Sequence, residues 1–222
     1  MRENIIQKRK ISVAICEEWL ERDKVLSGRQ KDAVRQYVRM HTDKPEELYQ
    51  IYDAMIRGEN YKAETLEVLM EEGQPVIKIA GKEIGAAFEQ LKDFVQKLIL
   101  LTERTLPLGS VVEVDIRELK LETEKPVASI KVVIVDRFMK KETEKQYVPY
   151  CGIIYPFGDS KKQLFFTEQA IHTVIHYGYT DRQEDAYVAL IKREIIKKGY
   201  SSYSFAEAED DKIRMLQSDI NL

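Results

Sequence analysis

The chain has 222 residues, of which 44% are hydrophobic and 33% charged, so it can form one or two folded domains and is not a disordered chain. The formal net charge of -3 argues against a nucleic-acid-binding protein with a strongly basic surface, and no apolar window is long enough for membrane insertion. Two cysteines and no visible signal peptide predict a cytoplasmic protein without a disulfide framework.

The N-terminal part of the chain is predicted to be helical. Apolar residues recur at helical spacing in three stretches, at about residues 4–25, 29–40 and 45–58. A fourth helix is expected over residues 60–73, because Asn60 can cap its start and Gly73 can end it. Leu66, Leu69 and Met70 share one face of that helix. About four helices are therefore expected before residue 75.

A different pattern follows at residues 74–82, where a short β-branched run predicts a strand or an extended connector. The apolar residues of segment 84–102 then step by four and three, which is the spacing of a helix that packs lengthwise on another helix. We expect this seam to lie within the chain, although a seam against a partner protein stays open. Residues 1–104 are thus predicted to form a helical module.

The hydrophobic period changes from helical to alternating after residue 105. Strands are expected at about residues 112–117, 127–138, 147–155 and 163–167, and a helical turn or strand at 168–179. Asp181 and Glu184 have capping-box spacing and open a helix that Gly199 ends. Residues 105–199 thus predict a small, mostly antiparallel β-sheet or partly open barrel with a C-terminal helix. Residues 200–222 are acidic and are expected to be a mobile tail, and the fold class is α+β.

Candidate catalytic and metal-binding residues are few. His172 and His176 lie ~13 Å apart in a strand, and Thr173 stands where a zincin helix needs glutamate. Cys16 and Cys151 have no histidine or second cysteine near them in the sequence. We expect no catalytic residue, no cofactor and no metal, although an enzyme with a dispersed site that uses Cys151 or the histidine pair stays open.

One helical face is basic. Lys31, Arg35 and Arg39 lie four residues apart, and a contact with an acidic partner is conceivable. Acidic neighbours such as Asp32 dilute this charge. We therefore expect a solvated helix face.

Aromatic residues are dense between residues 147 and 179. In a regular strand over 147–155, alternate residues face opposite sides, and the set that contains Tyr147 and Cys151 has more apolar bulk. We expect that set to point inward. Tyr150, Gly152 and Ile154 are then predicted to form a partner-binding outer surface, where a helix or strand of another protein can lie. The alternative is that the aromatic residues belong to the core.

Three segments resemble the bacterial domain-of-unknown-function family 4176. Leu106–Val112 is similar to its "LPIGSVV" opening, Tyr150–Gly158 to its "DYxGxxYPEG" segment, and residues 164–181 to its "YLFNHEDIxxVxxxGYxDE" ending. The similarity covers about residues 105–195. The strand that begins near Pro126 follows a longer insertion than the family's usual hairpin, and the N-terminal region has no counterpart in short family members.

The resemblance implies a direction and no catalytic residues. Members resemble small cytoplasmic proteins encoded in Gram-positive bacteria beside type VII secretion components and LXG-type toxins. We therefore expect a non-catalytic cytoplasmic binding protein, a chaperone or adaptor for a type VII-secreted helical substrate or LXG-type toxin. An immunity protein against such a toxin is the alternative, and an enzyme with a dispersed site is the alternative from another class. The partner's identity and the oligomeric state stay open.

Overall fold

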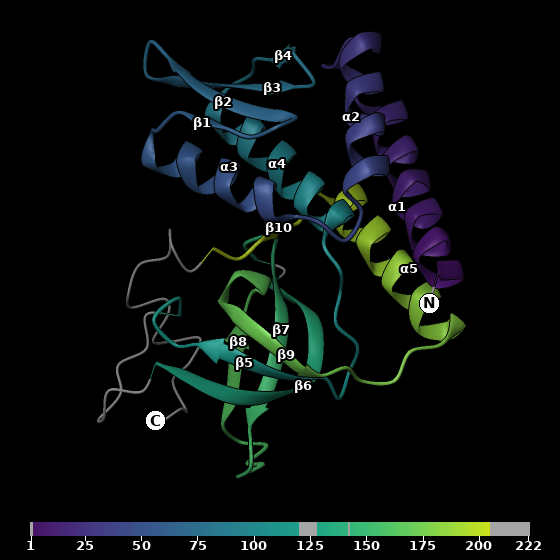
Figure 1. Ribbon diagram of the computed structural model, residues 1–222, viewed down its shortest axis with the longest axis vertical. Helices are drawn as coiled ribbons and strands as arrows, with labels where there is room; N and C mark the ends of the chain where they lie inside the picture. Colours follow the sequence, from purple (N-terminus) through teal and green to yellow (C-terminus); the bar gives the residue numbers. More distant parts are fainter. Residues whose placement is uncertain (1, 120–127, 142, 205–222) are drawn as a thin grey trace. The chain divides into compact units, whose positions relative to one another are not determined.

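The computed structural model describes residues 2–119, 128–141 and 143–204 (Figure 1). The chain forms two compact units, residues 1–105 with 185–199 and residues 106–184 with 200–222. Helices and antiparallel sheets lie in separate segments, so the predicted α+β class is confirmed. The larger sheet of the described part is open and does not close into a barrel.

The first unit contains a four-stranded antiparallel sheet in the order β1-β2-β3-β4, together with helices. Its helices are α1 (Arg2–Arg22), α2 (Gly28–His41), α3 (Glu46–Arg57), α4 (Phe88–Thr102) and most of α5 (Arg182–Lys198). Its strands are β1 (Tyr61–Lys62), β2 (Leu66–Glu71), β3 (Gln74–Ile79) and β4 (Lys82–Ile84).

The helix predicted over residues 60–73 is wrong, because this segment forms β1 and β2. Leu66 and Val68 are buried, with Glu67 half-buried between them, which is the alternation of a strand. Glu72 and Gly73, both at positive φ (50° and 79°), make the tight turn that joins β2 to β3. Two-residue hairpin turns need this left-handed backbone, so the glycine ends a strand here.

The seam of α4 is buried within the chain. Leu91, Val95, Leu98 and Leu101 belong to one core cluster with residues of α1, α2, α3 and the sheet. The rings of Trp19 on α1 and Phe94 on α4 lie 5.6 Å apart. The long helix therefore organises the core of the first unit.

The other face of this first sheet carries charges. Lys62 pairs with Glu67 at 3.7 Å across β1 and β2, and Lys78 pairs with Glu83 at 3.8 Å across β3 and β4. Exposed pairs of this kind contribute little stability, but they keep a sheet face soluble.

The second unit is built on a six-stranded sheet in the order β10-β7-β6-β5-β9, with β8 also paired to β7 (Figure 1). All pairs are antiparallel except that of β10 with β7. Its elements are β5 (Val111–Asp115), β6 (Ser129–Lys141), β7 (Gln146–Ile154), β8 (Gln163–Phe166), η1 (Glu168–Ala170), β9 (Ile171–His176) and β10 (Ser201–Ser202). The ambiguous segment 168–179 thus contains a helical turn followed by a strand.

The units divide the chain differently from the domains expected from the sequence. Residues 185–199, which the sequence placed in the domain 105–199, group with the first unit. In that unit Arg193 pairs with Glu18 at 2.8 Å, and Ile195 is buried. Of the expected mobile tail, residues 200–204 are described, with Tyr200 and Tyr203 buried, and residues 205–222 lie outside the described part.

Candidate functional site

The segment that precedes β5 is held by side chains of two neighbouring strands. The Leu106 N–H donates a hydrogen bond to the hydroxyl oxygen of Tyr150 at 3.1 Å. The carbonyl oxygen of Leu106 accepts one from Nη1 of Arg137, also at 3.1 Å. Leu106 is fully buried, so both polar groups of its backbone need such partners.

The turn at residues 107–110 is packed against Gly178. The hydroxyl of Ser110 donates to the Pro107 carbonyl at 2.8 Å and accepts the N–H of Gly178 at 3.0 Å. A Cβ atom at position 178 would lie 2.0 Å from the carbonyl oxygen of Leu108. Only glycine therefore fits at position 178 without a shift of the backbone.

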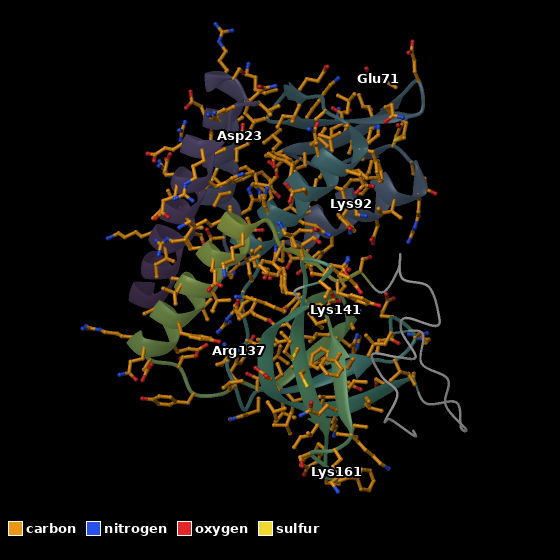
Figure 2. The ribbon with its side chains drawn as sticks, turned by 180° about the vertical axis from the view of Figure 1, so that it is seen from behind. Asp23, Glu71, Lys92, Arg137, Lys141 and Lys161 are labelled. Atoms are coloured by element: carbon orange, nitrogen blue, oxygen red, sulfur yellow. The ribbon has the colours of Figure 1, made fainter. Side chains whose placement is uncertain are left out.

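A buried ion pair joins β6 to the start of α5. Nη1 and Nη2 of Arg137 both bond to the carboxylate of Glu184, with Nη2 at 3.0 Å from Oε2. The side chains are only 3% and 18% exposed. Asp181 accepts the N–H of Glu184 at 2.9 Å and so caps the helix, as the capping-box spacing predicts. Figure 2 labels Arg137.

The predicted outward face of β7 is wrong for all three of its residues. Tyr150 is only 2% exposed and belongs to the core of the second unit, where its ring lies 5.5 Å from that of Phe166. Gly152 is also buried, and a Cβ there would lie 2.7 Å from the Val133 carbonyl oxygen. Ile154 is half-buried and pairs with Val132 of the core, so it lies on the core side of the sheet and not on the predicted outer face. Residues 147–152 are all buried. The amount of apolar side chain on each face of the strand therefore does not identify the face that packs in the core.

The cysteines and histidines do not form a reactive cluster in the part of the chain that is described. Burial raises the pKa of Cys16 and of Cys151 to about 12, which keeps both thiols protonated at neutral pH. His172 and His176 lie on β9, the strand conformation in which they are too far apart to share a metal ion. Within the described residues, no three His, Cys, Asp or Glu side chains are grouped so that they could hold one.

The basic face of α2 is engaged in contacts within the chain. Arg35 pairs with Glu17 at 2.6 Å and with Asp32 at 2.7 Å. The ammonium group of Lys31 donates to the Asp23 carbonyl at 2.6 Å. These contacts leave less charge available to an acidic partner.

One carboxylate is buried in the first unit. Glu103 ends α4, accepts a hydrogen bond from the Tyr49 hydroxyl at 3.3 Å, and offers its backbone carbonyl to Lys192 at 2.8 Å. Burial raises the pKa of Glu103, and the nearby Lys192 charge and the Tyr49 hydrogen bond offset only part of this rise.

We expect the stability of the protein to fall as pH rises through the raised pKa of Glu103. In that range the folded state holds a proton that the unfolded state has released, so each increase in pH favours unfolding. Glu103→Gln cannot titrate and should show a smaller fall as pH rises above the ordinary pKa of a glutamate. Urea unfolding of both proteins across this range measures the difference. Identical pH profiles of stability for the two proteins would show that the pKa of the Glu103 carboxyl is not raised in the folded state.

The face of the second sheet that lies opposite its core carries an apolar row. Val111 on β5 pairs with Val133 on β6, which pairs with Ile153 on β7. Their neighbours Val112 and Val132 are in the core, so these three side chains point to the other face, where they are half-buried. We call Val111, Val133 and Ile153 the apolar row.

The sequence contains a signal for the apolar row that β7 taken alone does not reveal. Consecutive β-branched residues stand at the same level in three strands: Val111-Val112, Val132-Val133 and Ile153-Ile154. Such pairs place apolar side chains on both faces of a sheet. Charged residues in place of Val111, Val133 and Ile153 would have indicated a solvated face.

Residues 105–187 match the family model "Domain of unknown function (DUF4176)". The resemblance inferred from the three sequence segments is thereby confirmed for this part of the chain. No curated protein and no solved structure matches the chain. The residues whose contacts are described above, including Leu106, Arg137, Tyr150, Gly178 and Glu184, all lie within the matched segment.

Proposed function

We propose that this protein is a non-catalytic binding protein that holds a segment of another protein on the outer face of its second sheet. The observation that carries the proposal is the apolar row Val111, Val133 and Ile153. Half-buried valine and isoleucine side chains in one line offer a surface that an amphipathic helix can cover with its apolar stripe. Apolar surface at this position is stabilised when a partner removes it from water.

The apolar row runs without interruption over three neighbouring strands, and on the same face it is bordered by Glu113 opposite Lys131. Sheet faces that only meet water are usually polar, and contiguous apolar faces mark interaction sites.

The partner class comes from the resemblance to the family. We propose a helical, type VII-secreted substrate or an LXG-type toxin, held in the cytoplasm before export. None of the described helices has the length and hydrophobicity to span a bilayer, which is compatible with this location. A chaperone or adaptor would bind the helical targeting segment of the toxin, whereas an immunity protein would bind its toxic domain.

The test compares Val133→Lys with Val76→Lys. Val76 is a half-buried residue on the outer face of the first sheet and is the matched control for Val133. Tagged wild-type and variant proteins are expressed in the native cell, and the proteins that co-purify are identified and quantified. Circular dichroism shows first that both variants fold.

We expect Val133→Lys to lose about 30-fold in partner affinity, equivalent to a hot spot of about 2 kcal/mol, while Val76→Lys binds like the wild type. Purified partner fragments then show whether the targeting helix or the toxic domain is bound. A folded Val133→Lys variant that retains every partner of the wild type contradicts the proposed surface.

A further inference from the structure

The chain between β7 and β8 forms an exposed turn at one end of the second sheet. All residues from 155 to 162 are exposed, and Figure 2 shows Lys161 beyond the ends of the strands. We call residues 155–162 the β7–β8 tip. The tip begins with Tyr155, Pro156 and Phe157, and the exposure of the two aromatic side chains is 55% and 84%. Phe157 is the most exposed large hydrophobic residue in the described part of the chain.

This run of exposed apolar residues is held in place by the backbone. The N–H of Gly158 donates to the Ile154 carbonyl at 3.0 Å, and the N–H of Lys161 donates to the Asp159 carboxylate, also at 3.0 Å. The φ angle of Gly158 is 67°, which lets the chain turn back directly after Phe157. Single apolar side chains are common on protein surfaces, but three in succession are unfavourable unless they serve a contact.

The same turn carries positive charge. Lys161 and Lys162 are exposed, and neither has a carboxylate partner among the described residues. The carboxylate of Asp159, the one acid of the turn, is used by the backbone N–H of Lys161. Two lysines and one aspartate give the β7–β8 tip a net charge of +1, although the whole chain has a net charge of -3. Aromatic and basic side chains therefore occur together at this end of the sheet.

We propose that the β7–β8 tip docks the protein on an anionic lipid surface. Tyr155 and Phe157 enter the boundary between headgroups and acyl chains, where aromatic side chains are favoured. The ammonium groups of Lys161 and Lys162 stay at the level of the lipid phosphates. The protein then lies on the membrane and does not cross it. This inference goes beyond the proposed function, which concerns the outer face of the sheet, and does not depend on it.

The size and the composition of the β7–β8 tip favour lipid over a protein partner. A standard protein–protein interface covers about 800 Å² on each partner with matching shapes, and a single turn offers much less. A lipid surface closes around a protruding side chain without a preformed pocket. Lysine is depleted from protein–protein interfaces, whereas anionic headgroups attract it.

The experiment is flotation of the purified full chain with lipid vesicles. One set of vesicles contains phosphatidylglycerol and phosphatidylcholine in equal amounts, and the other contains phosphatidylcholine alone. We expect the wild type to float with the anionic vesicles and less with the neutral ones. Added salt should release it, because salt screens the attraction between lysines and headgroups. A wild type that does not float with the anionic vesicles overturns the proposal.

The first variant removes the aromatic contact. Phe157→Ser should lower the partition onto anionic vesicles about ten-fold, because the side chain no longer leaves water. Tyr179→Ser is the matched control, since Tyr179 is 80% exposed. It follows Gly178, which packs against the turn before β5, at the opposite end of the sheet from the β7–β8 tip. The control should float like the wild type.

The second variant removes the positive charges. Lys161→Gln/Lys162→Gln should lower the partition about 30-fold, since each lysine near an anionic surface contributes to binding. Lys141→Gln/Lys145→Gln is the control and makes the same change in net charge. Both of its positions are exposed and lie at the turn between β6 and β7, at the other end of β7. This control should also float like the wild type.

A fluorescence measurement shows whether position 157 enters the lipid. In Phe157→Trp, the emission of the new indole should move to shorter wavelength when anionic vesicles are added, as it does in an apolar environment. Tyr179→Trp should show no shift. Trp19 is the one tryptophan of the wild type and is 9% exposed, so it gives both variants the same background.

The outcomes separate this inference from the proposed function. Flotation that neither the Phe157 variant nor the lysine variant reduces overturns the β7–β8 tip as the lipid contact. A wild type that does not float, together with a native protein that Phe157→Ser no longer co-purifies, shows a protein contact at the tip and overturns lipid docking. Flotation that is lost in the tip variants while Val133→Lys retains every partner supports lipid docking and refutes the apolar row.

Discussion

Replacing Arg137 by methionine should lower the free energy of unfolding by about 3–5 kcal/mol, the range for breaking one side of a buried ion pair. The guanidinium group is 3% exposed and bonds to both carboxylate oxygens of Glu184. Methionine fills much of the space but leaves the Glu184 carboxylate and the Leu106 carbonyl without this donor. Chemical denaturation of the full chain measures the loss.

Arg117→Met is the matched control for Arg137. Arg117 pairs with Asp115 near the end of β5, but its side chain is 76% exposed. Exposed pairs contribute little to stability, so this variant should be close to the wild type. A second substitution, Glu184→Leu, should recover part of the loss in the Arg137→Met background, because it removes the buried charge. Equal effects at Arg137 and Arg117 would contradict a buried pair.

Gly178→Ala should destabilise the protein by about 3 kcal/mol, the upper end for overpacked sites. The added methyl group would lie 2.0 Å from the Leu108 carbonyl oxygen and 3.0 Å from the Ser110 nitrogen, and these backbone atoms can move only if the turn before β5 moves. The hydrogen bond between Gly178 and Ser110 would be lost with them.

Gly85→Ala is the control for Gly178. No atom lies within 4 Å of the Cβ position at Gly85, and its φ angle is not in the left-handed region. Alanine there should be neutral or slightly stabilising, because it restricts the unfolded chain. Thermal melts of both variants give the comparison. If Gly178→Ala melts at the wild-type temperature, the turn and the segment after β9 are not in close contact.

Strand β5 of the second unit could be predicted from the sequence because its alternating period fits a strand and not a helix. Val112 and Val114 alternate with Glu113 and Asp115, and the structure places a strand there. The same reasoning from local period gives a wrong prediction for the segment that forms β2. Leu66, Leu69 and Met70 fit a helical face, and Gly73 fits either a helix end or a hairpin turn. The pairing of β2 with β3 is a long-range choice that a local pattern does not contain.

The position of Tyr150 could not be predicted for a different reason. Residues of a strand do alternate between its two faces, but the prediction assumed that one face of β7 meets water. From 147 to 152 both faces are buried, so apolar bulk does not distinguish them. The hydrogen bond from the Leu106 N–H to the Tyr150 hydroxyl decides the matter, because it places the tyrosine in the core with its polar atom satisfied.

The division of the chain also bears on how the protein can be cut. The chain passes from one unit to the other at residues 105–106, 184–185 and 199–200. A protease that cleaves at any one of these places leaves the units joined through the remaining two. Fragments for crystallography or display therefore have no single terminus at which the family-like unit can be trimmed. An excised version needs β10 reattached by an engineered linker in place of residues 185–199, because the second unit is discontinuous in the sequence.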